Sequence, residues 1–316
     1  MTPLARYLSP AIIAQVERLD LRARFIIEGY LAGRHRSSMH GFSVEFSEHR
    51  HYVPGDEPRS VDWKVFARTD RLFVRTYQAE TQLACHVLVD RSASMGAVGI
   101  EPLESASAIS TASQHAAGAS LTKLEYAVSL AAALAYLLHR QRDALGLAVL
   151  GERLERMIPA RARVDHLADV LAALSQLAPG GTTGVAAAIG DVLRHVPHRG
   201  LVILLSDLLT DPGGILEALH QVRFRGHDLI VMHVLDDAET SLPFRGPVVL
   251  EDPETGQQVT ADADAVRPRY LAALAAWRSE LASRLAGLRA DYVPLDTAEP
   301  FDRALGRFLV RRAKRR

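Results

Sequence analysis

Residues 85–96 read Cys-His-Val-Leu-Val-Asp-Arg-Ser-Ala-Ser-Met-Gly, an apolar run that ends at a carboxylate and two hydroxyls. The run lacks the strict polar and apolar alternation of a half-exposed strand, which favours a strand buried on both faces of a parallel sheet. Asp90, Ser92 and Ser94 follow at alternate positions past its carboxyl end. Open α/β sheets bind ligands at that edge. The stretch therefore predicts a first strand that carries a polar site.

The rest of the chain from residue 83 alternates short apolar runs with longer helical patterns. Further strands are expected at 144–150, 201–205 and 229–235, and helices at 122–140, 164–177, 185–195, 214–224 and 269–288. The first helix opens with Thr122-Lys-Leu-Glu125, which has the form of a capping box. This order predicts an α/β domain over 83–316 with a doubly wound, mostly parallel, Rossmann-like sheet.

Residues 1–82 have a different pattern. A helix is expected over 10–31, followed by a Gly- and Pro-containing polar stretch with strand-like pieces at 42–46 and 72–76. We expect a small α+β N-terminal module. Residues 97–120 contain seven Ala and five Ser among 24 positions, which is too little apolar surface to offset the entropy of ordering, so a mobile insertion is expected there. A weak helix is the alternative.

The overall composition excludes several classes of protein. The 316 residues include 37 Lys+Arg and 37 Asp+Glu, a balance that argues against a protein that coats nucleic acid or an anionic membrane. The single Cys85 excludes an internal disulfide and a cysteine-based zinc cluster. No apolar stretch approaches the length of a membrane span, and the first 20 residues lack a secretion signal. A cytoplasmic protein is expected.

Two further polar segments are expected at the same edge as the first strand end. Thr182 follows Gly180-Gly181, and Asp207 follows the run at 201–205. Together with Asp90, Ser92 and Ser94 they make five oxygen-bearing side chains with only two carboxylates. Such a set suits a hard divalent cation such as Mg²⁺ that keeps some of its waters and leaves a position open.

The pattern Asp90-x-Ser92-x-Ser94 with Thr182 and Asp207 resembles the metal-ion-dependent adhesion site of von Willebrand factor A domains. The resemblance implies that Ser92, Ser94 and Thr182 contact a cation (Mg²⁺, or Ca²⁺ or Mn²⁺) through their hydroxyls. It also implies that Asp90 and Asp207 hold the waters of that cation.

Two alternatives to this assignment exist within the same residues. Thr183 is the weaker choice for the threonine, because the family pattern places the ligand directly after the glycine pair. Residues 90–94 alone could also be a polar turn that caps a helix, since Asp and Ser are common at that position.

Residues 45–68, Glu-Phe-Ser-Glu-His-Arg-His-Tyr-Val-Pro-Gly-Asp-Glu-Pro-Arg-Ser-Val-Asp-Trp-Lys-Val-Phe-Ala-Arg, resemble the defining stretch of the domain-of-unknown-function-58 family. These bacterial and archaeal proteins place it directly before a von Willebrand A-like domain, and they are commonly encoded beside MoxR-type AAA+ ATPases. The motif residues are Arg50, Tyr52, Gly55, Asp56, Arg59, Asp62, Trp63 and Arg68. The sequence has no P-loop, so the resemblance implies a partner or adaptor of such an ATPase.

The charged residues of this motif allow a structural and a functional interpretation. Asp56, Arg59, Asp62 and Arg68 are expected to form buried or half-buried ion pairs that hold the module onto the α/β domain, since Trp63 and Phe66 suggest packing. A surface that binds a partner is the alternative.

The residues favour an interaction protein over an enzyme. We expect a protein that uses a divalent cation to bind an acidic side chain of the ATPase or of its client. The alternative is a metal-dependent phosphoryl-transfer enzyme of the haloacid dehalogenase kind. Such an enzyme needs a second aspartate two residues after the first, where this chain has Ser92. Neither Ser92 nor Ser94 lies in a Gly-x-Ser-x-Gly elbow.

Two other clusters are expected to have no special function. His35, His40, His49 and His51 lack the paired spacing of a zinc site, so a solvated or hydrogen-bonded role is expected. Six of the ten residues 307–316 are basic, which fits the end of a helix and a solvated tail.

Overall fold

The fold was obtained as a computed structural model, which describes residues 44–53, 61–79, 84–96, 100–102, 121–163 and 165–314. The described residues belong to two compact units, one within residues 27–82 and the other within residues 83–316. The helix expected over 10–31 and the histidines at positions 35 and 40 lie outside the described residues.

The larger unit is built on a six-stranded sheet. Its strands are β3 (Ala84–Asp90), β5 (Ala144–Leu150), β6 (Leu154–Arg161), β7 (Leu201–Ser206), β8 (Asp228–Leu235) and β11 (Asp291–Asp296). The spatial order is β11-β8-β7-β3-β5-β6, and every pair is parallel except β5 with β6. The expected doubly wound α/β fold with a mostly parallel sheet is confirmed.

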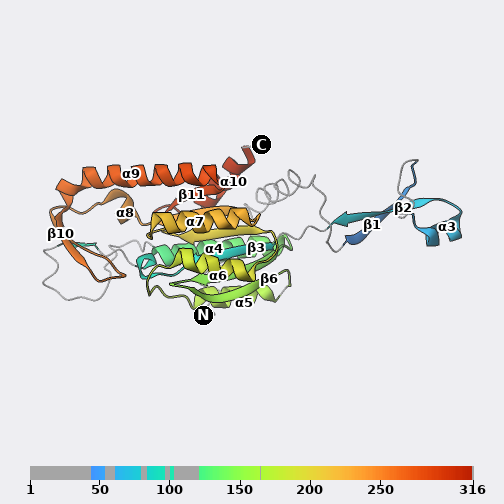
Figure 1. The fold of residues 1–316 in the computed structure, drawn as a ribbon, viewed down its shortest axis with the longest axis horizontal. Coiled ribbons are helices and arrows are strands. Elements are labelled where there is room, and N and C mark those ends of the chain that lie inside the picture. Colours follow the sequence, from blue (N-terminus) through green and yellow to red (C-terminus); the bar gives the residue numbers. More distant parts are fainter. Residues whose placement is uncertain are drawn as a thin grey trace. The chain divides into compact units, whose positions relative to one another are not determined.

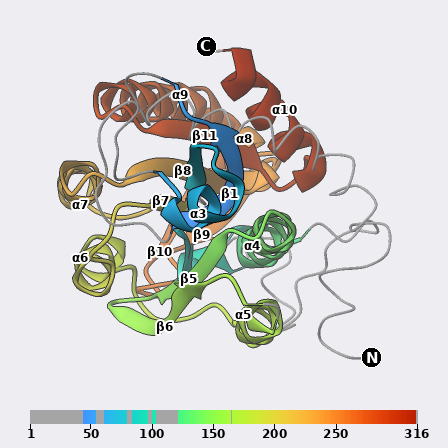
Figure 2. The ribbon, with the colours of Figure 1, turned by 90° about the vertical axis from the view of Figure 1, so that its right-hand side faces the viewer.

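Helices cover both faces of this sheet, with α6 (Val185–His195), α7 (Pro212–Phe224) and α9 (Ala263–Gly287) on one face (Figure 2). The other face carries α4 (Lys123–Arg140), α5 (His166–Ser175) and α10 (Phe301–Lys314) (Figure 2). The basic stretch expected to be the end of a helix and a solvated tail is helical as far as Lys314. Helix α9 begins six residues before the expected start, because Asp262 caps it and Pro268 is accommodated inside it.

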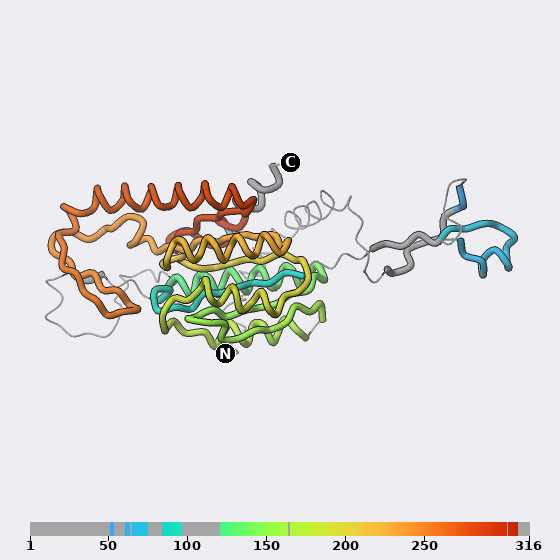
Figure 3. The backbone as a smooth tube through the Cα atoms, viewed as in Figure 1, coloured from blue at the N-terminus to red at the C-terminus, as the bar shows by residue number. Residues whose placement is uncertain are grey.

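A second, three-stranded sheet lies at one end of the α/β unit, where α9 begins (Figures 1 and 3). The hairpin β9 (Pro247–Glu251) and β10 (Gln258–Asp262) pairs with the short strand β4 (Ile100–Pro102). The expectation of a mobile insertion over 97–120 is therefore wrong for β4. A mean composition over 24 residues hides a three-residue edge strand, where proline is tolerated. Residues 97–99 and 103–120 lie outside the described residues.

The smaller unit is an antiparallel pair, β1 (Val44–His51) with β2 (Phe73–Ala79), and the short helix α3 (Trp63–Thr69). Of the motif residues, Arg50 lies in β1 and Tyr52 follows it, while Gly55, Asp56 and Arg59 lie outside the described residues. The His51 ring lies against Phe73, with 4.5 Å between ring centroids.

The remaining motif residues lie at and on α3. Asp62 is buried, and its Oδ1 accepts a hydrogen bond from Val65 N at 3.3 Å, as expected of a residue that caps a helix. Trp63 is 56% exposed and lies edge-on to Phe66. Arg68 is exposed. The expected ion pairs between this module and the α/β domain stay a prediction.

The two ends of α3 give a test of that prediction. Asp62→Ala is expected to lower the free energy of unfolding by at least about 1 kcal/mol, because the cap of α3 is lost. Arg68→Ala is expected to change it by less than about 0.5 kcal/mol, because the side chain is exposed. Urea unfolding of the full chain measures both. A loss of about 3–5 kcal/mol in the Arg68 variant would show instead that Arg68 is half of a buried ion pair.

Candidate functional site

Three of the five expected site residues follow the end of β3. Asp90 is its last residue. Ser92 directly precedes the short turn Ala93–Met95, and Ser94 lies within it. All three side chains are buried. Ser92 N donates to Asp90 Oδ1 at 2.9 Å, and the Ser92 and Ser94 hydroxyl oxygens are 3.0 Å apart. Ser206, at the end of the neighbouring strand β7, donates its hydroxyl to Asp90 Oδ2 at 2.6 Å. The carboxylate is therefore fixed through both oxygens.

The glycine pair before Thr182 is joined to this loop by the backbone. Gly180 N donates to Arg91 O at 2.9 Å, and Ala93 N donates to Gly181 O at 3.0 Å. Gly181 has a φ of 77°, a conformation that glycine adopts without steric cost. These two hydrogen bonds bring the exposed Thr182 to the loop that carries Ser92.

Thr183, the alternative threonine, faces a different group. Its backbone N donates to Glu254 Oε2 at 2.9 Å, and its hydroxyl donates to Glu254 Oε1. Glu254 lies in the turn between β9 and β10 and is half-buried among exposed neighbours. These hydrogen bonds hold the hairpin beside the threonine turn. The contact could not be predicted from the sequence, because 71 residues separate the two partners.

The fifth expected residue, Asp207, follows β7 and is fully buried. Its Oδ1 accepts a hydrogen bond from Leu209 N at 3.2 Å, and its Oδ2 accepts one from Lys123 Nζ at 2.8 Å. Lys123 is the first residue of α4, is 1% exposed, and also donates to Glu239 Oε1 at 2.6 Å. In the sequence, Lys123 is recognisable only as part of the capping box Thr122-Lys-Leu-Glu125. The one feature of the sequence that could have indicated its role is the position of a lysine at the start of an otherwise strongly apolar helix.

The backbone of Asp207 is held by His233 on the adjacent strand β8. His233 Nε2 lies 2.9 Å from Asp207 O, and its Nδ1 lies 2.7 Å from the Tyr292 hydroxyl. Burial lowers the pKa of His233 to about 4, so the ring is neutral at pH 7. Since a carbonyl can only accept, Nε2 carries the proton and Nδ1 accepts from tyrosine. This chain of hydrogen bonds fixes the position of Asp207.

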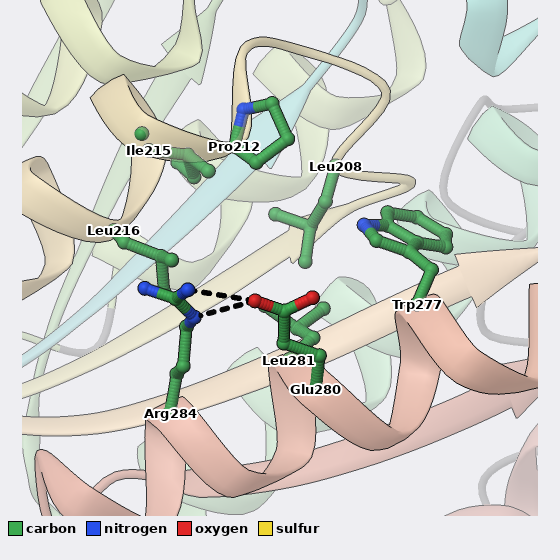
Figure 4. A pocket seen from close by; sticks show the side chains of 9 residues that line it. Leu208, Pro212, Ile215, Leu216, Trp277, Glu280, Leu281 and Arg284 are labelled. Carbon is green, nitrogen blue, oxygen red and sulfur yellow. Dashed lines mark hydrogen bonds and ion pairs between the residues drawn. The ribbon is translucent and has the colours of Figure 1, made fainter.

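Leu208, the residue after Asp207, lines a small pocket (Figure 4). Leu208 forms part of its wall, together with residues of α7 and with Trp277 and Leu281 of α9, and the cavity volume is about 190 Å³. Glu280 and Arg284 form an ion pair beside it. Leu208 is buried although its φ is 55°, an unusual value for leucine. Its burial in this wall anchors the loop that presents Asp207.

The site carries an excess of negative charge. Burial and the nearby Asp207 raise the pKa of Asp90 to about 6, against the lowering effect of hydrogen bonds from Ser206 and Ser92. Burial opposes the charged form of Lys123, but Asp207 and Glu239 outweigh it and raise the pKa of the lysine. The site thus has three carboxyl groups, those of Asp90, Asp207 and Glu239, and one ammonium group, which is a balance that favours a further cation.

The oxygen atoms of this site fit a hard divalent cation. Neighbouring ligands of an octahedral Mg²⁺, each at about 2.1 Å, lie about 3.0 Å apart, and the Ser92 and Ser94 hydroxyls have that separation. Among the described residues, no group of three or more His, Cys, Asp or Glu side chains could hold a metal ion by itself. A metal at this edge would therefore need hydroxyl ligands, which Ser92 and Ser94 would provide.

Comparisons with known proteins found curated relatives of similar sequence and solved structures with partial similarity to this chain. The chain is 29% identical over 309 residues to uncharacterized proteins of Mycobacterium tuberculosis and Mycobacterium bovis, covering 96% of this chain and 91% of theirs. A conserved hypothetical protein, BatB from Bacteroides thetaiotaomicron, matches 73% of this chain and 98% of its own, with a TM-score of 0.42 and 17% identity. An aerotolerance-related membrane protein from Bacteroides fragilis matches 74% of this chain and 100% of its own, with a TM-score of 0.41 and 14% identity.

The described helices include none that is long and apolar enough to cross a membrane. The family described as "Protein of unknown function DUF58" matches residues 48–105 and 106–280. With most of the chain matched, this protein belongs to the DUF58 family.

Proposed function

We propose that this protein is a divalent-cation-dependent protein-interaction module. The observation that carries the proposal is the convergence of Asp90, Ser92, Ser94 and Asp207 as buried side chains at the ends of two adjacent strands. The backbone hydrogen bonds of Gly180 and Gly181 bring Thr182 to the same loop. This is the set that the resemblance to the metal-ion-dependent adhesion site implies.

Each residue has a defined part in this proposal. Ser92, Ser94 and Thr182 hold the cation through their hydroxyls, and Asp90 and Asp207 hold its waters. When bound, a cation such as Mg²⁺ supplies an open coordination position that accepts a carboxylate. Because only two carboxylates of the protein, Asp90 and Asp207, face the cation, the cation keeps its affinity for an acidic side chain of a partner.

Phosphoryl transfer, the alternative function, has less support. A nucleophilic aspartate must reach the phosphorus atom, but Asp90 is fully buried and both its oxygens accept hydrogen bonds. The position of the acid two residues later is Ser92, whose hydroxyl lies against Ser94. These features favour a binding protein over an enzyme.

The partner we propose is a MoxR-type AAA+ ATPase or the client of that ATPase, and the place of the interaction is the cytoplasm. Membership of the DUF58 family supports this choice of partner. The resemblance of the N-terminal motif to that family implies a protein of a kind commonly encoded beside MoxR-type ATPases. The ATPase supplies the energy, and this chain supplies the cation-dependent contact.

The two adjacent threonines provide a matched test of the cation site. Thr182→Val is expected to weaken Mg²⁺ binding by at least about tenfold, because one hydroxyl ligand is lost. Thr183→Val removes the same atoms but only a contact with Glu254, so its Mg²⁺ affinity should stay close to that of the unmodified protein. Calorimetric titration of Mg²⁺ into each protein measures the difference. Equal affinities in both variants would contradict the assignment of Thr182.

A capture experiment tests the interaction itself. The MoxR-type ATPase encoded nearest to this protein is expected to be retained by the immobilised chain in the presence of Mg²⁺ and released by a chelator. Adding Mg²⁺ back should restore capture by the Thr183→Val protein but not by the Thr182→Val protein. Capture that persists in chelator would contradict a cation-dependent contact.

A further inference from the structure

Lys123 is a buried lysine whose position the proposed metal contacts do not explain. Its ammonium group joins three elements, since it belongs to the start of α4, contacts Asp207 after β7 and contacts Glu239 in α8 (Asp237–Ser241). Glu239 is itself fixed, because its other oxygen accepts from Asp236 N at 2.8 Å. The ammonium therefore lies between two immobilised carboxylates.

A buried lysine is costly unless it is paired, and apolar residues of similar size usually stabilise a core as well or better. Helix α4 is otherwise buried mostly through Ala, Leu and Val, so an apolar residue would suit packing. A fixed charge at this position has a different consequence. Asp90 and Asp207 are the two carboxylates assigned to the cation site, and the Lys123 ammonium, 2.8 Å from Asp207 Oδ2, offsets their charge whether or not a metal is present.

We propose that Lys123 is a positioning residue that keeps the cation site assembled when the metal is absent, so that loss of the metal ends partner capture without unfolding the domain. This inference rests on the proposed function. It makes cation binding a reversible switch on a preformed site.

The charges give Lys123 and Glu239 opposite effects on metal affinity. Removing the ammonium in Lys123→Met leaves the site more negative, which strengthens the attraction for a dication. Removing the carboxylate in Glu239→Gln leaves the ammonium less compensated, which weakens that attraction. A unit charge about 6 Å from a dication changes the affinity by about tenfold even at the dielectric constant of water. Simple structural damage would weaken binding in both variants.

Calorimetric titration of Mg²⁺ at pH 8 is the deciding measurement. Lys123→Met is expected to bind Mg²⁺ about tenfold more tightly than the unmodified protein, and Glu239→Gln more weakly. The metal-free Lys123→Met protein should melt about 10 °C lower, because carboxylates remain buried without their counter-charge. Saturating Mg²⁺ should raise the melting temperature of Lys123→Met by more than it raises that of the unmodified protein.

Three further variants keep the test decisive. The double variant Lys123→Met with Glu239→Gln removes one charge of each sign and should fold with a Mg²⁺ affinity close to the original. Lys123→Arg keeps the charge and should preserve both affinity and metal-free stability. Leu130→Ala, a buried residue of the same helix, should lower stability without changing the affinity.

The possible failures are distinct. If the unmodified protein binds no divalent ion, the proposed function fails. If it binds Mg²⁺ but Lys123→Met and Glu239→Gln shift the affinity in the same direction, only the role of Lys123 is overturned.

Discussion

Replacing Asp90 by alanine is expected to abolish divalent-cation binding and partner capture while leaving the α/β fold in place. Asp90 is the residue through which the end of β3, the serine turn and β7 are joined, since it accepts from Ser92 N and from Ser206 Oγ. Without its carboxylate the site loses one of the two negative charges closest to the cation. The hydroxyls of Ser92 and Ser94 alone are weak ligands, so no measurable affinity should remain.

The fold survives because the Asp90 carboxylate does not stabilise the metal-free protein. Its pKa of about 6 lies above the ordinary value of 3.8, so ionisation at pH 7 opposes folding by roughly 3 kcal/mol. Stability linked to this group is therefore lost as the pH rises from about 4 to above 6. Removing it relieves that cost, which offsets the two hydrogen bonds that are lost.

Asp90→Asn is the matched variant, because it keeps the shape and a carbonyl acceptor for Ser92 N. It should fold, lose the pH dependence between pH 4 and 7 that the carboxylate causes, and bind no Mg²⁺. Circular dichroism during urea unfolding checks the fold, and calorimetry checks the cation. A variant at position 90 that folds and still binds Mg²⁺ with unchanged affinity would refute the central place of Asp90.

The sheet could be predicted from sequence where strands are buried on both faces. Strands β3, β5, β7 and β8 are continuous apolar runs, and their order along the chain places the polar residues at one edge. The edge strands β6 and β11 could not be predicted in this way, because only strands buried on both faces need a continuous apolar sequence. β6 and β11 are only partly buried, and their sequences, such as Asp-Tyr-Val-Pro-Leu-Asp in β11, carry no such run.

Contacts between distant segments were beyond sequence reasoning. Lys123 and Asp207 are separated by 84 residues, and nothing local in the sequence indicates that the start of α4 lies beside the end of β7. The fastening of Thr183 by Glu254 depends on a hairpin whose strands are largely exposed. The residues of the candidate site were predictable because each follows its own strand or glycine turn, whereas their charge balance depends on the tertiary fold.

The glycine that ends the threonine turn supplies the second large effect, in stability. A Cβ at Gly184 would lie 2.0 Å from the backbone oxygen of Glu152, and a backbone atom cannot rotate away as a side chain can. Gly184 also caps α6 and donates its N–H to Gly151 O at 3.1 Å. Gly184→Ala should therefore lower the free energy of unfolding by about 3 kcal/mol or more, the upper range for overpacking.

The clash at position 184 should also displace the turn at the cation site, because Thr182 lies two residues before Gly184 and this turn is held by backbone hydrogen bonds. Mg²⁺ affinity should fall together with stability. Gly190→Ala, in the same helix, has no atom within 4 Å of the added Cβ and should instead stabilise the protein by roughly 0.5–1 kcal/mol with unchanged affinity. Urea unfolding and Mg²⁺ titration of the two variants separate the effects. If Gly184→Ala lost stability but kept its Mg²⁺ affinity, Thr182 would not depend on the position of this turn, and its assignment as a ligand would be contradicted.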